Sequence, residues 1–235
     1  MVRMKQIAKI SGIAYLMIFL SGFYANFSVL ESLVDIHSPT VTLTNFVNGH
    51  SQFGYGLLGF VVMLFFDVLL VWSLFYLTQS VSRNLSFVAS FFRLMHAIFF
   101  GIALSKLWRA YQLTAEVESA IDLELEVMNL VSDFDLVWTL GLLIFGLHLI
   151  VLGFLSLKST FIPKIIGLFL LLAAMGYMLD GIAKLAYENY LIYRPYFEMG
   201  VVLTGVIGEL SFTIWLLFKG LKKEKNYNTG KQVSR

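Results

Sequence analysis

Cysteine is absent from this chain of 235 residues, and charged residues make up only 14% of it. Without cysteine the protein has no disulfide, thiol nucleophile, Fe–S cluster or Cys-ligated zinc. The sequence also lacks a phosphate-binding loop, a dinucleotide motif and the H-x-x-x-H and H-E-x-x-H spacings of metal-binding helices. Its net charge of +2 is too small to indicate a nucleic-acid partner.

Apolar residues are abundant instead, at 58% of the chain, and the mean hydropathy is +0.79. These values are typical of a membrane protein, because soluble domains contain about 45–50% apolar and about 25% charged residues. A transmembrane helix needs about 20 mostly apolar residues. Six segments meet this requirement, at residues 7–29, 53–78, 85–109, 134–157, 163–186 and 198–219. The sequence therefore predicts an all-α, six-helix transmembrane domain over residues 1–221, with the signal-like first segment retained as a span.

The positive charges indicate the orientation of these spans. One side of the membrane would hold twelve of the seventeen Lys and Arg residues, namely Arg3, Lys5, Lys9, Arg83, Lys158, Lys164, Lys219, Lys222, Lys223, Lys225, Lys231 and Arg235. Because cytoplasmic loops carry the excess of Lys and Arg, we expect both termini in the cytoplasm. Residues 222–235 form a basic cytoplasmic tail that we expect to contact anionic lipid headgroups.

Two outer loops have helical features. The loop at residues 110–133 is acidic, and its apolar residues recur at helical spacing, which predicts a helix that lies on the bundle or extends a neighbouring span. In the first outer loop, Ser38-Pro39-Thr40 predicts a turn before a short interfacial helix.

Five ionisable residues inside the spans form the candidate site: Asp67, Arg93, His96, His148 and Glu209. Such a residue costs about 2.5–3.5 kcal/mol at a span centre, so it normally faces the bundle interior and finds a partner. Counting about 1.5 Å per helical residue places all five at one depth, slightly cytoplasmic of the midplane. Asp67 and Arg93 come from spans joined by a short turn, and we expect them to form an ion pair.

Asp180 and Lys184 lie in the outer half of the fifth span, four residues apart. This spacing places them on one helix face and predicts a local ion pair.

Several functions remain open at this point. Buried titratable groups can bind or translocate a small solute or ion, especially in a homo-oligomer, although no paired broken helices indicate an inverted-repeat carrier. His96, His148, Asp67 and Glu209 could bind a divalent metal, which would allow an intramembrane enzyme acting on a lipid or small amphiphile. Two histidines could also ligate a b-type haem. Alternatively, the charges only fix helix packing in a structural or accessory subunit.

Two runs carry a family resemblance. LTQSVSRNLSFVASFFRLMHAIFFGI resembles the L-x-x-V-S-R-x-L-(x)-F-R-L pattern of a bacterial membrane family known as domain of unknown function 4386. FGLHLIVLGFLSLKSTFIPKIIGLFLLLAAMGYMLD is similar to its G-L-H-L…G…S…P-x-x-x-G…G-Y-x-x-D signature, and the likeness covers most of residues 8–218. The resemblance implies a six-helix inner-membrane protein without adding an activity. The family's polar positions correspond to Asp67, Arg83, Arg93, His148 and Asp180, whereas His96 and Glu209 are outside the pattern.

Overall fold

The computed structural model describes residues 2–115 and 121–221, and this part of the chain is helical, with no strand. In chain order the elements are α1 (Val2–Phe23), the π-helix η1 (Tyr24–Leu30), α2 (Glu31–Leu33), α3 (Pro39–Asn48), α4 (His50–Thr78), α5 (Arg83–Leu113), α6 (Ile121–Lys158), α7 (Lys164–Ala186), α8 (Tyr190–Gly205), the π-helix η2 (Val206–Leu210) and α9 (Ser211–Leu221).

Six helical stretches are long and apolar enough to cross a membrane, which confirms the predicted all-α membrane fold. They are Met4–Leu33, His50–Thr78, Arg83–Leu113, Leu123–Lys158, Lys164–Ala186 and Tyr190–Lys219. The last stretch begins at Tyr190 rather than at residue 198, because the helix continues through Pro195. The first and last stretches are each interrupted by a π-helix, η1 and η2.

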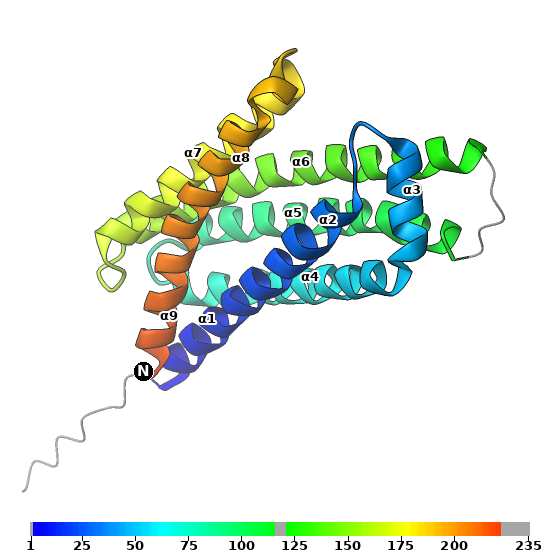
Figure 1. Cartoon of the computed structure of the whole chain (residues 1–235). Helices are drawn as coiled ribbons and strands as arrows, with labels where there is room; N and C mark the ends of the chain where they lie inside the picture. Colours follow the sequence, from blue (N-terminus) through cyan, green and yellow to red (C-terminus); the bar gives the residue numbers. More distant parts are fainter. Residues whose placement is uncertain (1, 116–120, 222–235) are drawn as a thin grey trace, which may run out of the picture.

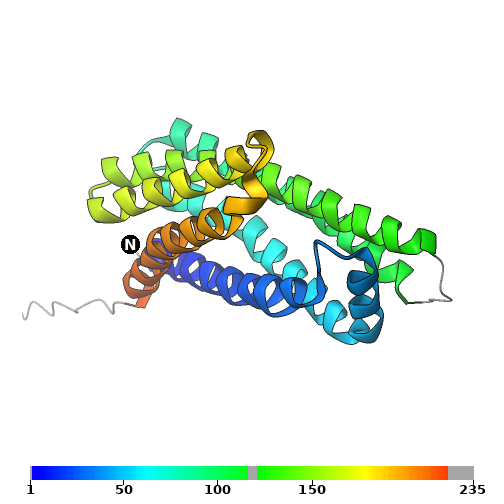
Figure 2. The ribbon, with the colours of Figure 1, turned by 45° about the horizontal axis from the view of Figure 1, so that its top comes forward.

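The helices pack mainly with neighbours in the chain, as α4 with α5, α5 with α6 and α6 with α7. Helix α1 packs against α4 and also against α9, so the first and last spans lie together. In Figure 1 the start of α1 and the end of α9 lie at the same end of the molecule, as an even number of spans requires. Figure 2 also shows α1 and α9 side by side at this end. The assignment of that end to the cytoplasm stays a prediction.

The interfacial helix expected in the first outer loop is α3. Ser38 caps it, with its hydroxyl oxygen accepting a hydrogen bond from the Val41 amide at 3.3 Å, and Pro39 occupies its first position. The acidic outer loop also contains helix, as predicted, because α5 extends to Leu113 and α6 begins at Ile121. The predicted basic tail, residues 222–235, lies outside the described residues.

Two separate apolar clusters form the core. One contains Phe60, Phe100 and Phe134, and the other contains Leu70 and Phe145 together with parts of α1, α7 and α9. On α4, Asp67 falls between Phe60 of one cluster and Leu70 of the other, whereas His148 on α6 lies between Phe145 and Leu149 of the second cluster. We call the buried residues Asp67, Arg93, His96 and His148 the polar layer.

Close contact between α6 and α7 depends on two facing glycines. A methyl group at Gly167 would lie 2.9 Å from the Gly153 carbonyl oxygen, which is closer than van der Waals contact allows. Small residues permit such approaches between membrane helices, where packing provides much of the attraction.

We expect Gly167→Ala to destabilise the protein by about 1–3 kcal/mol, because the added methyl forces the two backbones apart. The measurement is the thermal unfolding temperature in detergent. Gly200→Ala is the matched control, since a methyl group there would meet nothing within 4 Å. An equal fall in both variants would show that the α6–α7 contact is less tight than described.

Candidate functional site

Arg93 of α5 forms the centre of the polar layer. Its side chain is buried, and Nη2 donates a hydrogen bond to Asp67 Oδ1 of α4 at 2.5 Å. This contact is the ion pair predicted from the sequence. Nη1 donates to the Tyr15 hydroxyl of α1 at 3.0 Å and to His148 Nε2 of α6 at 3.2 Å. The guanidinium group therefore joins four helices through three polar partners.

His148 is held as a neutral imidazole by two hydrogen bonds. Its Nδ1 lies 2.8 Å from the Ala89 carbonyl oxygen, which can only accept, so Nδ1 carries the proton. Nε2 is then the unprotonated nitrogen that accepts from Arg93. Both ring nitrogens are occupied, and His148 serves as an acceptor for the buried cation.

His96 is oriented in a similar way but leaves one nitrogen unused. Its Nδ1 donates to the Gly141 carbonyl oxygen of α6 at 3.0 Å, so Nε2 of the neutral ring has a lone pair. Nε2 faces Asp67 Oδ2 at 3.8 Å, which is too long for a hydrogen bond. Within residues 2–115 and 121–221, Asp67 Oδ2 finds no hydrogen-bond partner, although it is buried. Two acceptors thus face each other inside the bundle.

Two aromatic residues that sequence reasoning missed complete this arrangement. The Tyr15 ring centroid lies 5.0 Å from Arg93 Cζ, and the Phe145 ring centroid lies 5.4 Å from it, so both rings stabilise the guanidinium by cation–π attraction. The signal for Tyr15 was available, since a hydroxyl in the middle of an apolar span needs a hydrogen-bond partner. Phe145 had no such signal, because phenylalanine is common throughout the spans.

Glu209 lies beside the cluster rather than in it. Its Oε1 accepts a hydrogen bond from the Tyr177 hydroxyl of α7 at 2.7 Å. Phe145 connects the two groups, because its ring packs against Tyr177 with centroids 5.3 Å apart and also against Arg93. Glu209 is still close enough to Arg93 for electrostatic attraction. It lies in the π-helix η2, and such interruptions are frequent at functional sites.

The predicted Asp180–Lys184 pair is not the contact that forms. Lys184 Nζ instead binds Asp135 Oδ1 of α6 at 2.5 Å, and Asp180 Oδ1 accepts from the Tyr190 hydroxyl at 2.7 Å. Helical spacing placed both residues on one face correctly, but partners on α6 and α8 were not visible in the sequence.

The metal and haem hypotheses find no ligand set in the described residues. No group of three or more His, Asp or Glu side chains converges there in a geometry that could hold a metal ion. Both nitrogens of His148 are used in hydrogen bonds, and Glu209 lies apart with Tyr177. In the described residues the candidates His96, His148, Asp67 and Glu209 therefore do not converge as a set of metal ligands, and His148 has no free ring nitrogen for a haem iron.

We expect Asp67→Asn to destabilise the protein by about 3–5 kcal/mol, because it leaves the buried Arg93 without its countercharge. The measurement is reversible unfolding in detergent. Asp133→Asn is the matched control: Asp133 pairs with Lys106 at 2.9 Å, but its side chain is 52% exposed, so the loss should stay below about 1 kcal/mol. Similar losses in the two variants would contradict a central role for the Arg93–Asp67 pair.

Comparison with known proteins agrees with this architecture. A protein of Archaeoglobus fulgidus, described as "Uncharacterized protein", is 31% identical over 175 residues, which cover 74% of this chain and 90% of the relative. No solved structure matches the chain. The model of the family described as "Domain of unknown function (DUF4386)" matches residues 10–220 and confirms the resemblance noted in the two sequence runs. The chain therefore belongs to the DUF4386 family.

Proposed function

We propose that this multi-pass membrane protein binds a proton between His96 and Asp67 and translocates it across the membrane. One observation carries the proposal: the buried oxygen Asp67 Oδ2 has no partner within the described part of the chain and faces the unused nitrogen of His96 at 3.8 Å. An unsatisfied buried carboxylate oxygen is costly, and a single proton on His96 would supply the missing donor.

The size of the space favours a proton over a larger solute. Asp67, Arg93, His96 and His148 are each at most 3% exposed, and none of them lines either of the two hollows beside the α7–α8 turn. The sequence-based hypothesis was that the cluster binds a small solute or ion, and we propose the proton as this ion. A larger molecule would have to displace the Arg93 contacts.

In the proposed binding step one O–H bond breaks and one N–H bond forms. His96 Nε2 takes a proton from a hydronium ion and water leaves. The imidazolium and the Asp67 carboxylate then approach from 3.8 Å to hydrogen-bond distance, and Nε2 donates to Oδ2. The other groups facing His96 are Arg93 on α5 and His148 on α6, and neither needs to change partner. Protonation of His96 adds one positive charge to the cluster. Because the charges of Asp67 and Arg93 already cancel each other, an ionised Glu209 nearby would balance the added charge.

The positive-inside distribution supports placing this cluster nearer the cytoplasmic face, with both termini in the cytoplasm. The same argument supports contact between the basic end of the bundle and anionic lipid headgroups.

Proton flux into liposomes tests the proposal. We expect the purified protein, reconstituted with a pH-sensitive dye inside the vesicles, to acidify the lumen under a potassium-diffusion potential. His96→Gln should reduce the flux to that of protein-free vesicles, because glutamine can still donate to the Gly141 carbonyl oxygen but does not titrate.

His50→Gln is the matched control, since His50 also bonds a backbone carbonyl, that of Tyr111, at 3.1 Å but lies at the outward end of α4. This variant should retain the flux. If His96→Gln folds normally and conducts as well as the original protein, the proton site is not between His96 and Asp67. If neither the original protein nor His96→Gln conducts protons, the cluster serves helix packing, which is the structural alternative.

A further inference from the structure

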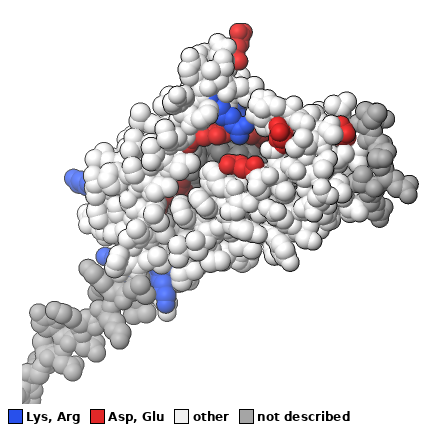
Figure 3. All heavy atoms as spheres, in the orientation of Figure 1, with Lys and Arg blue, Asp and Glu red and all other residues white. Residues whose placement is uncertain are grey.

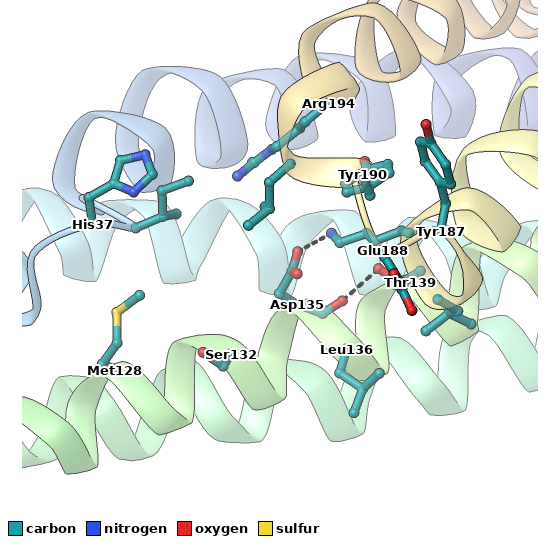
Figure 4. Close-up of a pocket in the computed structure, with 14 residues that line it drawn as sticks. His37, Met128, Ser132, Asp135, Leu136, Thr139, Tyr187, Glu188, Tyr190 and Arg194 are labelled. Carbon is teal, nitrogen blue, oxygen red and sulfur yellow. Dashed lines mark hydrogen bonds and ion pairs between the residues drawn. The ribbon is translucent and has the colours of Figure 1, made fainter.

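A hollow of about 440 Å³ lies beside the turn between α7 and α8, where this turn approaches α6. Charged side chains of both signs gather around it, over α6 and the α7–α8 turn (Figure 3). Figure 4 shows Asp135, Glu188, Tyr190 and Arg194 arranged around this space, with His37 on the opposite wall. The polar cluster around Arg93 contributes no residue to the lining, so the two sites are separate.

Two of the charges in the hollow already neutralise each other. Lys184 Nζ binds Asp135 Oδ1 at 2.5 Å, which leaves this pair without net charge. Arg194 uses only Nε for its bond to Glu198 Oε1, at 2.6 Å. The contact on Nε leaves the two terminal nitrogens of Arg194 for another partner, and its side chain is 30% exposed.

Glu188 supplies the opposite charge. It lines the same hollow, is exposed, and makes no hydrogen bond or ion pair with the residues that the structure describes. The hollow thus offers one guanidinium group with unused donors and one carboxylate with unused acceptors. A guanidinium fork matches the oxygens of a phosphate, and a carboxylate accepts hydrogen bonds from an ammonium group. Together they fit a ligand that carries both.

An aromatic hollow adjoins this charged one. It is lined by Tyr187, Tyr193, Tyr196 and Phe197, and Tyr187 lines both hollows. The neighbouring surface is strongly apolar, with Leu191 and Ile192 more than 65% exposed. Tyrosines at the end of a span are typical of the membrane–water interface, where headgroups lie. A ligand in the charged hollow would therefore extend its apolar part along the aromatic one.

We infer that the hollow binds the headgroup of a zwitterionic phospholipid, with its phosphate on Arg194 and its primary ammonium on Glu188. The acyl chains lie along the Tyr187–Tyr196 surface. This inference goes beyond proton binding and does not depend on it.

Titration of the full chain in detergent tests the inference. We use dihexanoyl phosphatidylethanolamine as the zwitterionic lipid, the matching phosphatidylglycerol as a lipid without the ammonium, and phosphoethanolamine as the headgroup alone. The readout is the rise in unfolding temperature with ligand concentration, which measures affinity because a ligand that binds the native state stabilises it. We expect the phosphatidylethanolamine to bind most tightly.

Glu188→Gln should weaken binding of the phosphatidylethanolamine about tenfold or more, since it removes one charged hydrogen bond, and leave phosphatidylglycerol unchanged. Arg194→Lys should weaken binding of both lipids, because it keeps the charge but loses the fork. Lys106→Gln, in an ion pair outside the hollow, is the control and should bind as the original chain does. The unfolding temperature without ligand shows whether each variant is folded.

Three results would overturn the inference. Equal affinity for the two lipids, or unchanged binding by folded Glu188→Gln, would exclude recognition of the ammonium group. Equal affinity for phosphoethanolamine would exclude a lipid as the ligand and indicate a soluble molecule. None of these results bears on proton flux through His96.

Discussion

The bundle depends on one buried cation that is shared among four helices. Arg93 donates to Asp67, Tyr15 and His148, so moving any one of α1, α4, α5 or α6 would break a charged hydrogen bond away from water. Burial makes each contact expensive to lose, because the alternative is an unsatisfied charge in an apolar surrounding. These hydrogen bonds fix how the four helices are positioned along one another. Apolar contacts, which are not directional, would fix these positions less strictly.

The polar layer contacts both apolar clusters. The His96 ring packs against Phe100 of one cluster and against Phe145 of the other. Most of the layer is internally satisfied, including both nitrogens of His148. Among the described residues the exceptions are Arg93 Nε, which has no hydrogen-bond partner, and the gap between the two acceptors His96 Nε2 and Asp67 Oδ2. A titratable group is most useful where hydrogen bonding is incomplete, and the proton proposal therefore rests on this gap.

The charged hollow at the α7–α8 end follows a different principle. Its charged groups are at least partly exposed, their ion pairs are weak individually, and they leave one donor group and one acceptor group unused. Membrane helices that end in tyrosines and charges meet the headgroup layer, where such groups contact polar ligands without being dehydrated. The cluster and the hollow therefore suit ligands of different size: a proton inside the bundle and a headgroup at its surface.

The sequence by itself determined the fold class, the six spans, the capped helix after Ser38 and the Asp67–Arg93 pair. These features depend on hydropathy, local capping and the depth of residues in spans joined by a short turn. Only the tertiary structure decided the partners of Asp180, Lys184 and Glu209, the role of Tyr15 and the hollow beside Arg194. The physical reason is that helical periodicity gives the face and depth of a residue, whereas its partner depends on how separate helices rotate and cross.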